Sequence, residues 1–324
     1  MILHVANGHS ATTLIELSGV PGRTTIWADP LHDGPVPGNV SDDELLRVRA
    51  AFLAGTPEQV DEIAADLAQW RAAIDDQDTF DELVLWFEHD LFDQLNLIQL
   101  LSHLGMRKPL KPVAMVQIDS YPGHPHFKGI GELMPADVEA LFHTRRPVTP
   151  DQLTLAKSAW SAYRSADPRA IEQLLQGDTS ALPFLARALS RHLEEFPSDA
   201  DGLSRSERRL MELALDRPVD IHEAFPRMHD GETAYYITDL SFFDAANALA
   251  TSSPPLLTIN LANPNGSAMP VGTLELTAHG RDVLLGRADR LQLCGIDRWL
   301  GGVYLQGSGP VWRWSRRAGH LIEA

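Results

Sequence analysis

Cysteine is almost absent from this sequence, and long hydrophobic runs are missing altogether. The 324 residues contain a single cysteine, Cys294, which excludes an intramolecular disulfide and any zinc or iron–sulfur site built from several cysteines. This cysteine use is typical of the reducing cytoplasm, where we expect the protein to reside. No run of about 18 apolar residues is present, so no transmembrane helix is predicted. The opening MILHVANGHS lacks the regions of a secretory signal and predicts a β-strand.

Positive charge is also scarce. Lys and Arg number 27 against 44 Asp and Glu, which gives a net charge of −17. Residues 1–134 carry 8 basic and 20 acidic side chains (net −12), and residues 203–324 carry 12 basic and 14 acidic ones (net −2). This acidic field repels nucleic acid and anionic membranes at long range. We therefore expect no membrane binding, and nucleic-acid binding would need a local basic surface.

The length and the 44% hydrophobic content are sufficient for two or three domains. We expect a Rossmann-like α/β domain over residues 1–134 and a helical segment over residues 135–197. A linker, PSDADG, occupies residues 197–202. A small winged-helix-like α+β domain is expected over residues 203–324.

Short apolar runs alternate with helical patterns in residues 1–134. The predicted strands are Ile2–Ala6, Thr24–Ala28, Glu82–Phe87 and Val113–Ile118. The predicted helices are Ala11–Leu17, Asp42–Leu53, Pro57–Ile74 and Leu91–Leu104. This alternation predicts a mainly parallel sheet, in which ligands bind beyond the carboxyl ends of the strands.

The remainder of the chain predicts more helices and one hairpin. The middle segment predicts helices at Pro135–Phe142, Pro150–Arg164, Pro168–Gln176 and Leu182–Phe196. Ser204 and Glu207 form a capping box at the start of the next helix. Further helices are predicted at Ile221–Phe225, Leu240–Leu249 and Ala278–Leu285, and strands at Pro255–Leu261 and Thr273–Thr277, with an NPNG turn at 263–266. Helices followed by a hairpin is the order of a winged-helix module, although other small α+β folds share it.

The first candidate site follows the first predicted strand. Gly8 allows a tight turn after Asn7, and the next helix begins with His9 and Ser10. The backbone N–H groups of a helix N-terminus, with the Ser10 hydroxyl, could bind an anion. Alternatively, Asn7 and Ser10 only satisfy the turn and cap the helix.

The other predicted strands also end in polar side chains. Convergence of these groups on one rim is the strongest functional signal of the sequence. Clustered carboxylates raise one another's pKa, and a histidine beside a carboxylate can act as a base. Alternatively, Asp90 and Asp93 only complement a helix N-terminus, and Asp29 only fixes a turn. We assign acid–base roles to Asp33, His32, Glu88, His89 and Asp90, and ligand binding to Asp29 and Asp119.

Two further features leave alternatives open. Arg145 and Arg146 could bind phosphate or carboxylate, or could neutralise a helix C-terminus. Histidines and carboxylates are suitable metal ligands, and His124 and His126 share one loop, but no established metal motif is present, so a metal stays open and no cofactor is indicated. Nucleophilic catalysis has little support, because G-x-S-x-G is absent and Cys294 is far from the histidine-rich loops.

The C-terminal region combines arginines with tryptophans and contains no lysine. Such residues can bind nucleic acid, but a W-x-W sequence in a strand is more often core or interface. Gly301 and Gly302 beside Trp299 predict close backbone packing. The arginines are Arg205, Arg208, Arg209, Arg313, Arg316 and Arg317, and the tryptophans Trp299, Trp312 and Trp314.

Several long strings resemble an uncharacterised bacterial family labelled domain of unknown function 1835. They are HVxNGxS at 4–10, WxDxLHxGPVP at 27–37, LWFEHDLxDQL at 85–95, PGxxxFxGxG at 122–131, RPVT at 146–149, DTSALPFL at 178–185, RHLEEFP at 191–197, LSxxER at 203–208 and GIDRWLGG at 295–302. The resemblance covers almost the whole chain and implies its architecture, but no activity. The family usually has Asp where this chain has His9, so a catalytic or metal role for that Asp would imply altered activity here.

These observations favour an enzyme. It would bind a small anionic ligand, a nucleotide or phosphoester, at the strand ends and use carboxylate and histidine acid–base chemistry for hydrolysis or group transfer. The alternative is a non-enzymatic ligand sensor whose C-terminal module binds nucleic acid or a protein partner. One continuous arginine surface in that module would favour the alternative, and a mixed surface would not. The sequence does not indicate the substrate or the oligomeric state.

Overall fold

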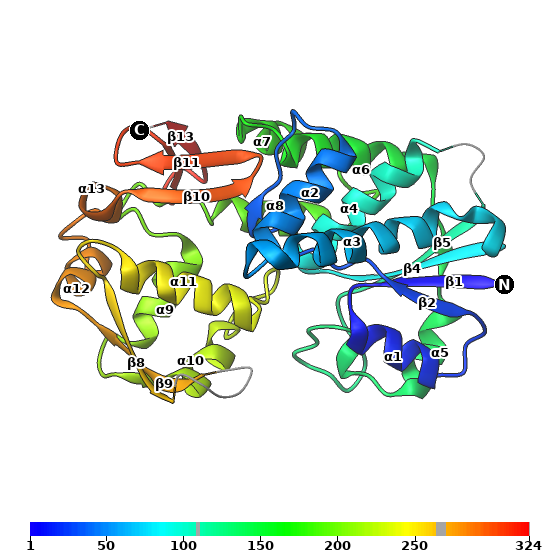
Figure 1. Cartoon of the computed structure of the whole chain (residues 1–324), viewed down its shortest axis with the longest axis horizontal. Coiled ribbons are helices and arrows are strands. Elements are labelled where there is room, and N and C mark those ends of the chain that lie inside the picture. Colours follow the sequence, from blue (N-terminus) through cyan, green and yellow to red (C-terminus); the bar gives the residue numbers. More distant parts are fainter. Residues whose placement is uncertain (108–110, 264–269, 324) are drawn as a thin grey trace. The chain divides into compact units, whose positions relative to one another are not determined.

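A five-stranded sheet is the centre of the N-terminal part of the chain in the computed structural model, which describes residues 1–107, 111–263 and 270–323 (Figure 1). The strand order is β2-β1-β4-β5-β6, with β1 to β5 parallel within the sheet and β6 antiparallel to β5. The expected mainly parallel sheet is therefore confirmed. The strands are β1 (Ile2–Ala6), β2 (Arg23–Ile26), β4 (Glu82–Glu88), β5 (Val113–Ile118) and β6 (Arg146–Pro147); the short β3 (Gly34–Pro35) lies outside this sheet.

Helices cover both faces of this sheet (Figure 1). On one face α1 (His9–Leu17) packs against α5 (Pro135–Phe142), and on the other α4 (Leu91–Gly105) packs against α6 (Pro150–Tyr163). Near β2, α2 (Asp42–Leu53) contacts α3 (Val60–Asp75). The smaller elements here are η1 (Pro57–Gln59), η2 (Gln77–Thr79), η3 (Ile130–Glu132) and α7 (Arg169–Leu175).

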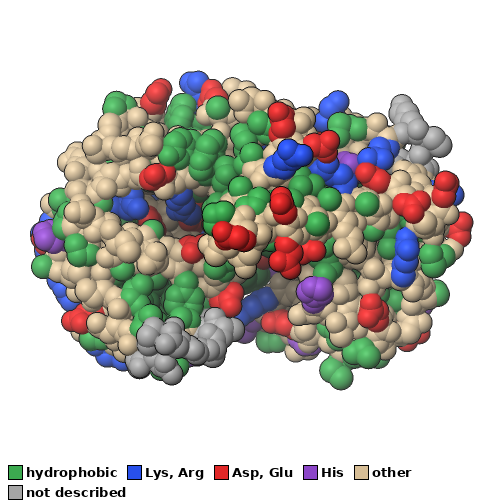
Figure 2. All heavy atoms as spheres, in the orientation of Figure 1, with side chains coloured by type: hydrophobic (Ala, Val, Ile, Leu, Met, Phe, Trp, Pro, Cys, Tyr) green, Lys and Arg blue, Asp and Glu red, His purple; other side chains and the backbone are tan. Residues whose placement is uncertain are grey.

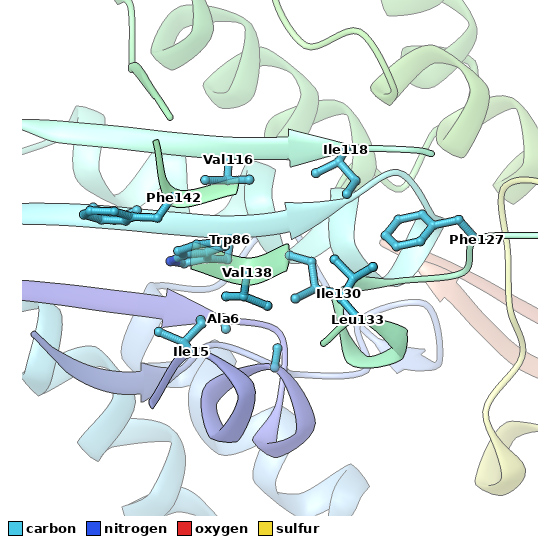
Figure 3. Packing of buried hydrophobic residues seen from close by; sticks show 12 residues of the cluster. Ala6, Ile15, Trp86, Val116, Ile118, Phe127, Ile130, Leu133, Val138 and Phe142 are labelled. Atoms are coloured by element: carbon cyan, nitrogen blue, oxygen red, sulfur yellow. The ribbon is translucent and has the colours of Figure 1, made fainter. Parts of the chain in front are cut away.

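The buried strand β4 explains the position of the core. Alternate side chains point to opposite faces, so Val84 and Trp86 join the hydrophobic cluster between the sheet and helices α1 and α5. Figure 3 shows Trp86 in this cluster. Leu83, Leu85 and Phe87 are also buried. A strand covered on both faces has no polar alternation, which is why β4 is a nearly continuous apolar run. Its first polar residue after that run, Glu88, lies at the carboxyl end of the strand.

The chain divides into two compact units. The first unit comprises Met1–Ala188 and Gly301–Val303, and the second comprises Leu189–Leu300 and Tyr304–Ala324. Most of the expected middle segment joins the first unit because α6 packs on α4. The division falls within α8 (Leu185–Leu193), before the expected linker at 197–202.

Gly301 is part of the first unit. Its φ is +60°, and a Cβ there would lie 2.5 Å from the carbonyl oxygen of Tyr163, while the Gly302 N–H donates to that oxygen at 3.0 Å. Glycine is required here by both the backbone conformation and the close approach. The predicted close packing at Gly301-Gly302 is thus confirmed.

The second unit contains a three-stranded antiparallel sheet of order β7-β9-β8. Its strands are β7 (Val219–Asp220), β8 (Leu257–Asn263) and β9 (Val271–Leu276). Its helices are α9 (Arg205–Leu213), α10 (Ile221–Met228), α11 (Asp239–Thr251), α12 (Ala278–Leu284) and α13 (Arg290–Cys294). The Ser204–Glu207 capping box is present at α9. Most of the turn predicted at 263–266 lies outside the described residues.

The tryptophan-rich tail forms strands that the sequence did not predict. They are β10 (Ile296–Gly301), β11 (Val303–Gly307), β12 (Trp312–Ser315) and β13 (His320–Glu323). The last two pair with each other as an antiparallel hairpin. Gly307, which ends β11, and Gly319, in the turn between β12 and β13, both have positive φ.

Candidate functional site

Asn7 and Glu88 meet at the carboxyl edge of the main sheet. The parallel register pairs Ala6 of β1 with Trp86 of β4, so the residues that follow these positions emerge at the same edge. The side-chain amide Nδ2 of Asn7 donates to Glu88 Oε2 at 2.5 Å and to Asp93 Oδ2 at 2.9 Å. The residues predicted from the ends of these two strands are therefore in direct contact.

Backbone and amide donors hold this acidic cluster in place. Glu88 Oε1 accepts from the Ile130 N–H at 2.6 Å, and Asp93 Oδ1 accepts from the Glu88 N–H at 2.9 Å. Gln94 donates its Nε2 to the Glu88 carbonyl at 2.7 Å. The buried Gln94 Oε1 has no hydrogen-bond donor among the described residues, so it can accept from a ligand or water.

Asp90 brings a third carboxyl group to the same place. Its Oδ1 accepts from the Asp93 N–H at 2.9 Å, so Asp90 is the N-cap of α4. This is the helix-terminus role considered above, and it also places Asp90 close enough to Asp93 for their charges to interact. We define Glu88, Asp90 and Asp93 as the acidic cluster.

The acidic cluster is arranged to retain protons. Burial raises the pKa of Glu88, and it raises the pKa of Asp90 and Asp93 well above the ordinary value. The neighbouring carboxylates add to this: Asp93 acts on Asp90, and Glu88 on Asp93. No Lys or Arg of the described chain forms an ion pair with these three carboxyl groups. A carboxylic acid that keeps its proton near neutral pH can donate it to a substrate.

His32 and Asp33 are neighbours, and His32 interacts electrostatically with Asp90 of this cluster. His32 Nε2 is 3.2 Å from Asp33 Oδ2, and the Asp33 side chain is 22% exposed. The charge of His32 acts on Asp90 and lowers its pKa, against the larger effect of burial. Asp33 is thus the more exposed member of a pair whose histidine acts on Asp90.

His89 is held between two aromatic rings. Its ring centroid lies 6.4 Å from that of Phe127 and 6.2 Å from that of Phe184. Burial lowers the pKa of His89, the positive charge of Arg187 lowers it further, and Asp119 partly opposes both. Arg187 is exposed and was not among the predicted residues, since nothing in the sequence links α8 to this edge.

The N-terminus of α1 is open for an anion. Gly8 occupies the N-cap without a side-chain hydrogen bond, and the first turn has no acidic residue. His9 and Ser10 are exposed. The free N–H groups of this turn and the positive end of the helix dipole favour a negatively charged group.

Asp29 has a structural role. Arg49 Nε lies 3.0 Å from both carboxylate oxygens of buried Asp29, and Arg49 Nη2 is 2.7 Å from Oδ1. Arg49 also donates to the carbonyl of Asp33 at 2.6 Å, while Asn96 binds the Asp29 backbone. These contacts favour the alternative in which Asp29 fixes the turn over a role in ligand binding.

Arg145 and Arg146 are not gathered with the acidic cluster, whereas Asp119 leaves β5 at the same edge of the sheet and acts on His89. Asp119 is exposed after β5, where Ser120 Oγ donates to its carboxylate at 3.1 Å. Arg145 pairs with Glu82, the first residue of β4, at 3.1 Å and lies over the Phe142 ring. Arg146 is exposed in β6, opposite Met115. These arginines are therefore at the other end of β4 from Glu88.

No group of three or more His, Cys, Asp or Glu within the described ranges has the geometry to hold a metal ion. His126 is exposed, and His124 bridges to Tyr121 within its loop. The metal left open by the sequence therefore gains no assigned ligands from the described part of the chain.

The second unit presents a mixed surface rather than a basic one. Its arginines are mostly engaged by carboxylates. The pairs are Arg205 with Glu194, Arg208 and Arg316 with Asp201, Arg209 with Asp230, and Arg313 with Asp289. Of the six arginines singled out above, exposed Arg317 is the one with no such pair in the described chain. The continuous arginine surface that would favour nucleic-acid binding is not formed by these residues.

No family model matches this chain, and no curated protein matches it either. Among the described residues, none of the helices is both long enough and apolar enough to cross a membrane.

Proposed function

We propose that the first unit is the catalytic part of an enzyme that acts by acid–base chemistry on a small anionic substrate, a nucleotide or phosphoester. One observation carries this proposal: Glu88, Asp90 and Asp93 are buried together with raised pKa values and without an ion-pair partner in the described chain. Burying three acids costs stability, and active sites are where such costs are commonly found. The Rossmann-like order of strands and helices adds support, since ligands of such sheets bind beyond the strand ends.

Each group has a separate role in the proposed reaction. Ser10 and the free N–H groups of the first turn of α1 bind the anionic group, and Arg187 adds a positive charge from α8. The protonated cluster donates a proton to the leaving oxygen, while a carboxylate accepts one from the attacking water or hydroxyl. His32 and Asp33 transfer protons between solvent and Asp90.

A screen of nucleotides and phosphoesters for released phosphate tests this proposal. We expect the Asp90→Asn and Glu88→Gln variants to lose turnover by about 100-fold or more, the usual effect of removing an acid–base group. Glu82→Gln, at the opposite end of the same strand, is the matched control and keeps its activity. Equal turnover in all four proteins, or no turnover by the unaltered protein on the whole panel, would overturn the proposal.

The alternative regulatory function rests on the order of elements in the second unit. The succession α9, β7, α10, α11, β8, β9 with sheet order β7-β9-β8 supports a winged-helix interpretation. In helix-turn-helix modules the second helix of the pair enters the major groove. The corresponding α11 has Asp239 and Asp244 and no Lys or Arg, so a protein partner suits it better than DNA. A gel shift at low salt would reveal any DNA binding.

A further inference from the structure

A pocket lies in the first unit, at the carboxyl end of β2. It is bounded by side chains of α2, α3 and α4, with Trp27 following β2 and Trp160 on α6. It involves none of the three residues of the acidic cluster, so an inference from it does not depend on the proposed enzyme activity.

Three indole rings line this pocket. Trp27 is buried, and its Nε1 donates to Gln99 Oε1 at 2.8 Å. Trp160 is buried and stacks on Tyr163 with a centroid distance of 6.1 Å. Trp70, on α3, is half-buried. Two of the rings are thus fixed by their own contacts, and a fixed aromatic face binds a flat ring with little loss of side-chain entropy.

Two polar groups in the pocket are available to a ligand. The side chain of Ser102 is buried and its hydroxyl forms no hydrogen bond within the described residues. Gln99 uses its oxygen for Trp27, which leaves its amide N–H groups as donors. An aliphatic ligand would leave these groups unsatisfied, whereas a ring with nitrogen and carbonyl groups would satisfy them.

The charges around the pocket favour a neutral ligand. Arg71 is engaged by Asp43 at 2.7 Å and by the Asp42 carbonyl at 3.0 Å, and Arg49 by Asp29. Figure 2 shows acidic side chains next to basic ones over this region, so the pocket is not surrounded by free positive charge. A phosphate would therefore meet paired arginines and acidic side chains, which disfavours it.

We propose that this pocket binds a planar heteroaromatic ring of the nucleobase class, carried by an uncharged molecule such as a nucleoside. The flat faces come from Trp27, Trp70 and Trp160, and the hydrogen bonds from Ser102 and Gln99. The ring stacks on the indoles, and Ser102 and Gln99 form hydrogen bonds with the nitrogen and carbonyl groups at the edge of the ring.

Isothermal titration calorimetry of the full chain with adenosine, guanosine, cytidine and uridine tests this assignment. We expect saturable binding of at least one nucleoside and weaker binding of its 5′-monophosphate. Trp70→Ala should weaken binding about tenfold or more, since each stacked base contributes strongly to affinity. Ser102→Ala should weaken it several-fold. Trp299→Ala, which removes an indole stacked on Tyr304 in the second unit, is the matched control and should bind normally.

Three results would overturn the proposal. One is the absence of saturable binding by all four nucleosides at millimolar concentration. Another is equal affinity of the unaltered protein and the Trp70→Ala variant. The third is binding of decanol in place of every nucleoside, which would assign the pocket to an aliphatic ligand. Because Trp70 is half-buried on a helix surface, its replacement should leave the fold intact, and circular dichroism checks this.

Discussion

Asn7 donates one side-chain amide group to two carboxyl groups, those of Glu88 and Asp93, which come from opposite sides of the strand-to-helix turn after β4. This contact connects the ends of two parallel strands and gives the acidic cluster a neutral donor in place of a cation. A cation here would lower the pKa of both acids strongly, whereas the Asn7 amide lowers the pKa of Asp93 less than burial and Glu88 raise it. The pKa values of Glu88 and Asp93 therefore stay raised with this donor present.

Removing this amide should destabilise the first unit. In Asn7→Ala, Glu88 and Asp93 each lose a hydrogen-bond donor while they stay buried. We expect the free energy of unfolding to fall by about 1–3 kcal/mol. Urea unfolding followed by hydrogen exchange of peptides from β1 and β4 measures the loss and assigns it to this unit. A loss close to zero would mean that the contact does not hold the cluster together.

The acidic cluster also predicts how the stability of the first unit changes with pH. The pKa of Asp93 is raised in the folded state, so the folded form binds more protons than the unfolded form above about pH 4. Its contribution to stability is complete below that pH and is lost as the pH rises toward the folded-state pKa. Asp93→Asn should flatten this decline between pH 5 and pH 8, roughly the window above the unfolded pKa.

Asp66→Asn is the matched control for this effect. Asp66 is exposed on α3, so this variant removes one negative charge without touching the cluster. It should keep the decline of the unaltered protein. If both variants gave the same profile, overall charge would be responsible rather than the proton held at Asp93.

The second unit should respond to pH in the opposite direction. Burial alone would raise the pKa of Glu195, but the charges of Arg191 and Arg298 lower it to about 2. The stability that this carboxylate contributes is present above its unfolded pKa of about 4 and is lost as the pH falls toward 2. Hydrogen exchange of α8 and α9 peptides should therefore accelerate in acid.

Arg191 is the central cation of that cluster. It lies 2.7 Å from Glu195 and 2.8 Å from Glu232, and all three side chains are nearly inaccessible to solvent. Arg191→Met leaves two buried carboxylates without their central cation. We expect the free energy of unfolding to fall by about 3–5 kcal/mol at neutral pH. Arg217→Met, which removes an exposed ion pair with Glu223, should cost much less. Similar losses in the two variants would show that the buried cluster adds no special stability.

The buried pair of Asp29 and Arg49 makes a further prediction. Arg49→Met leaves Asp29 as an unpaired buried charge and removes the donor to the carbonyls of Pro30 and Asp33. We therefore expect the free energy of unfolding to fall by about 3–5 kcal/mol. Arg47→Met, two positions earlier on the same helix and exposed, should change the free energy of unfolding little. Chemical unfolding of the two variants side by side measures the difference.

Local patterns predicted most of the first unit. Apolar runs marked β1 and β5 to the residue, and the Ser41 capping box and acidic first turn mark the start of α2 where it was predicted. The second strand was predicted to reach Ala28 but ends at Ile26. The strands of the tail were missed because each is short and depends on pairing with a neighbour rather than on its own pattern.

The site was predictable where strand ends determine it. Asn7, Glu88 and Asp90 follow strands that are neighbours in a parallel sheet, so their convergence follows from topology. Asp29 was assigned to ligand binding because its partner, Arg49, is 20 positions away on an amphipathic helix and looks like any exposed arginine. Trp27, Trp70 and Ser102 went unnoticed because no local pattern shows that three helices enclose one pocket.

Infrared spectroscopy can show whether the acidic cluster holds a proton at neutral pH. The C=O stretch of a protonated carboxylic acid is separate from that of carboxylate, and it can be followed in a difference spectrum as the pH is raised through neutrality. We predict that the unaltered protein shows this band at pH 7, that it disappears at higher pH, and that Asp93→Asn lacks much of it while Asp66→Asn retains it. A spectrum of the unaltered protein with only carboxylate at pH 7 would show that the acidic cluster holds no proton there.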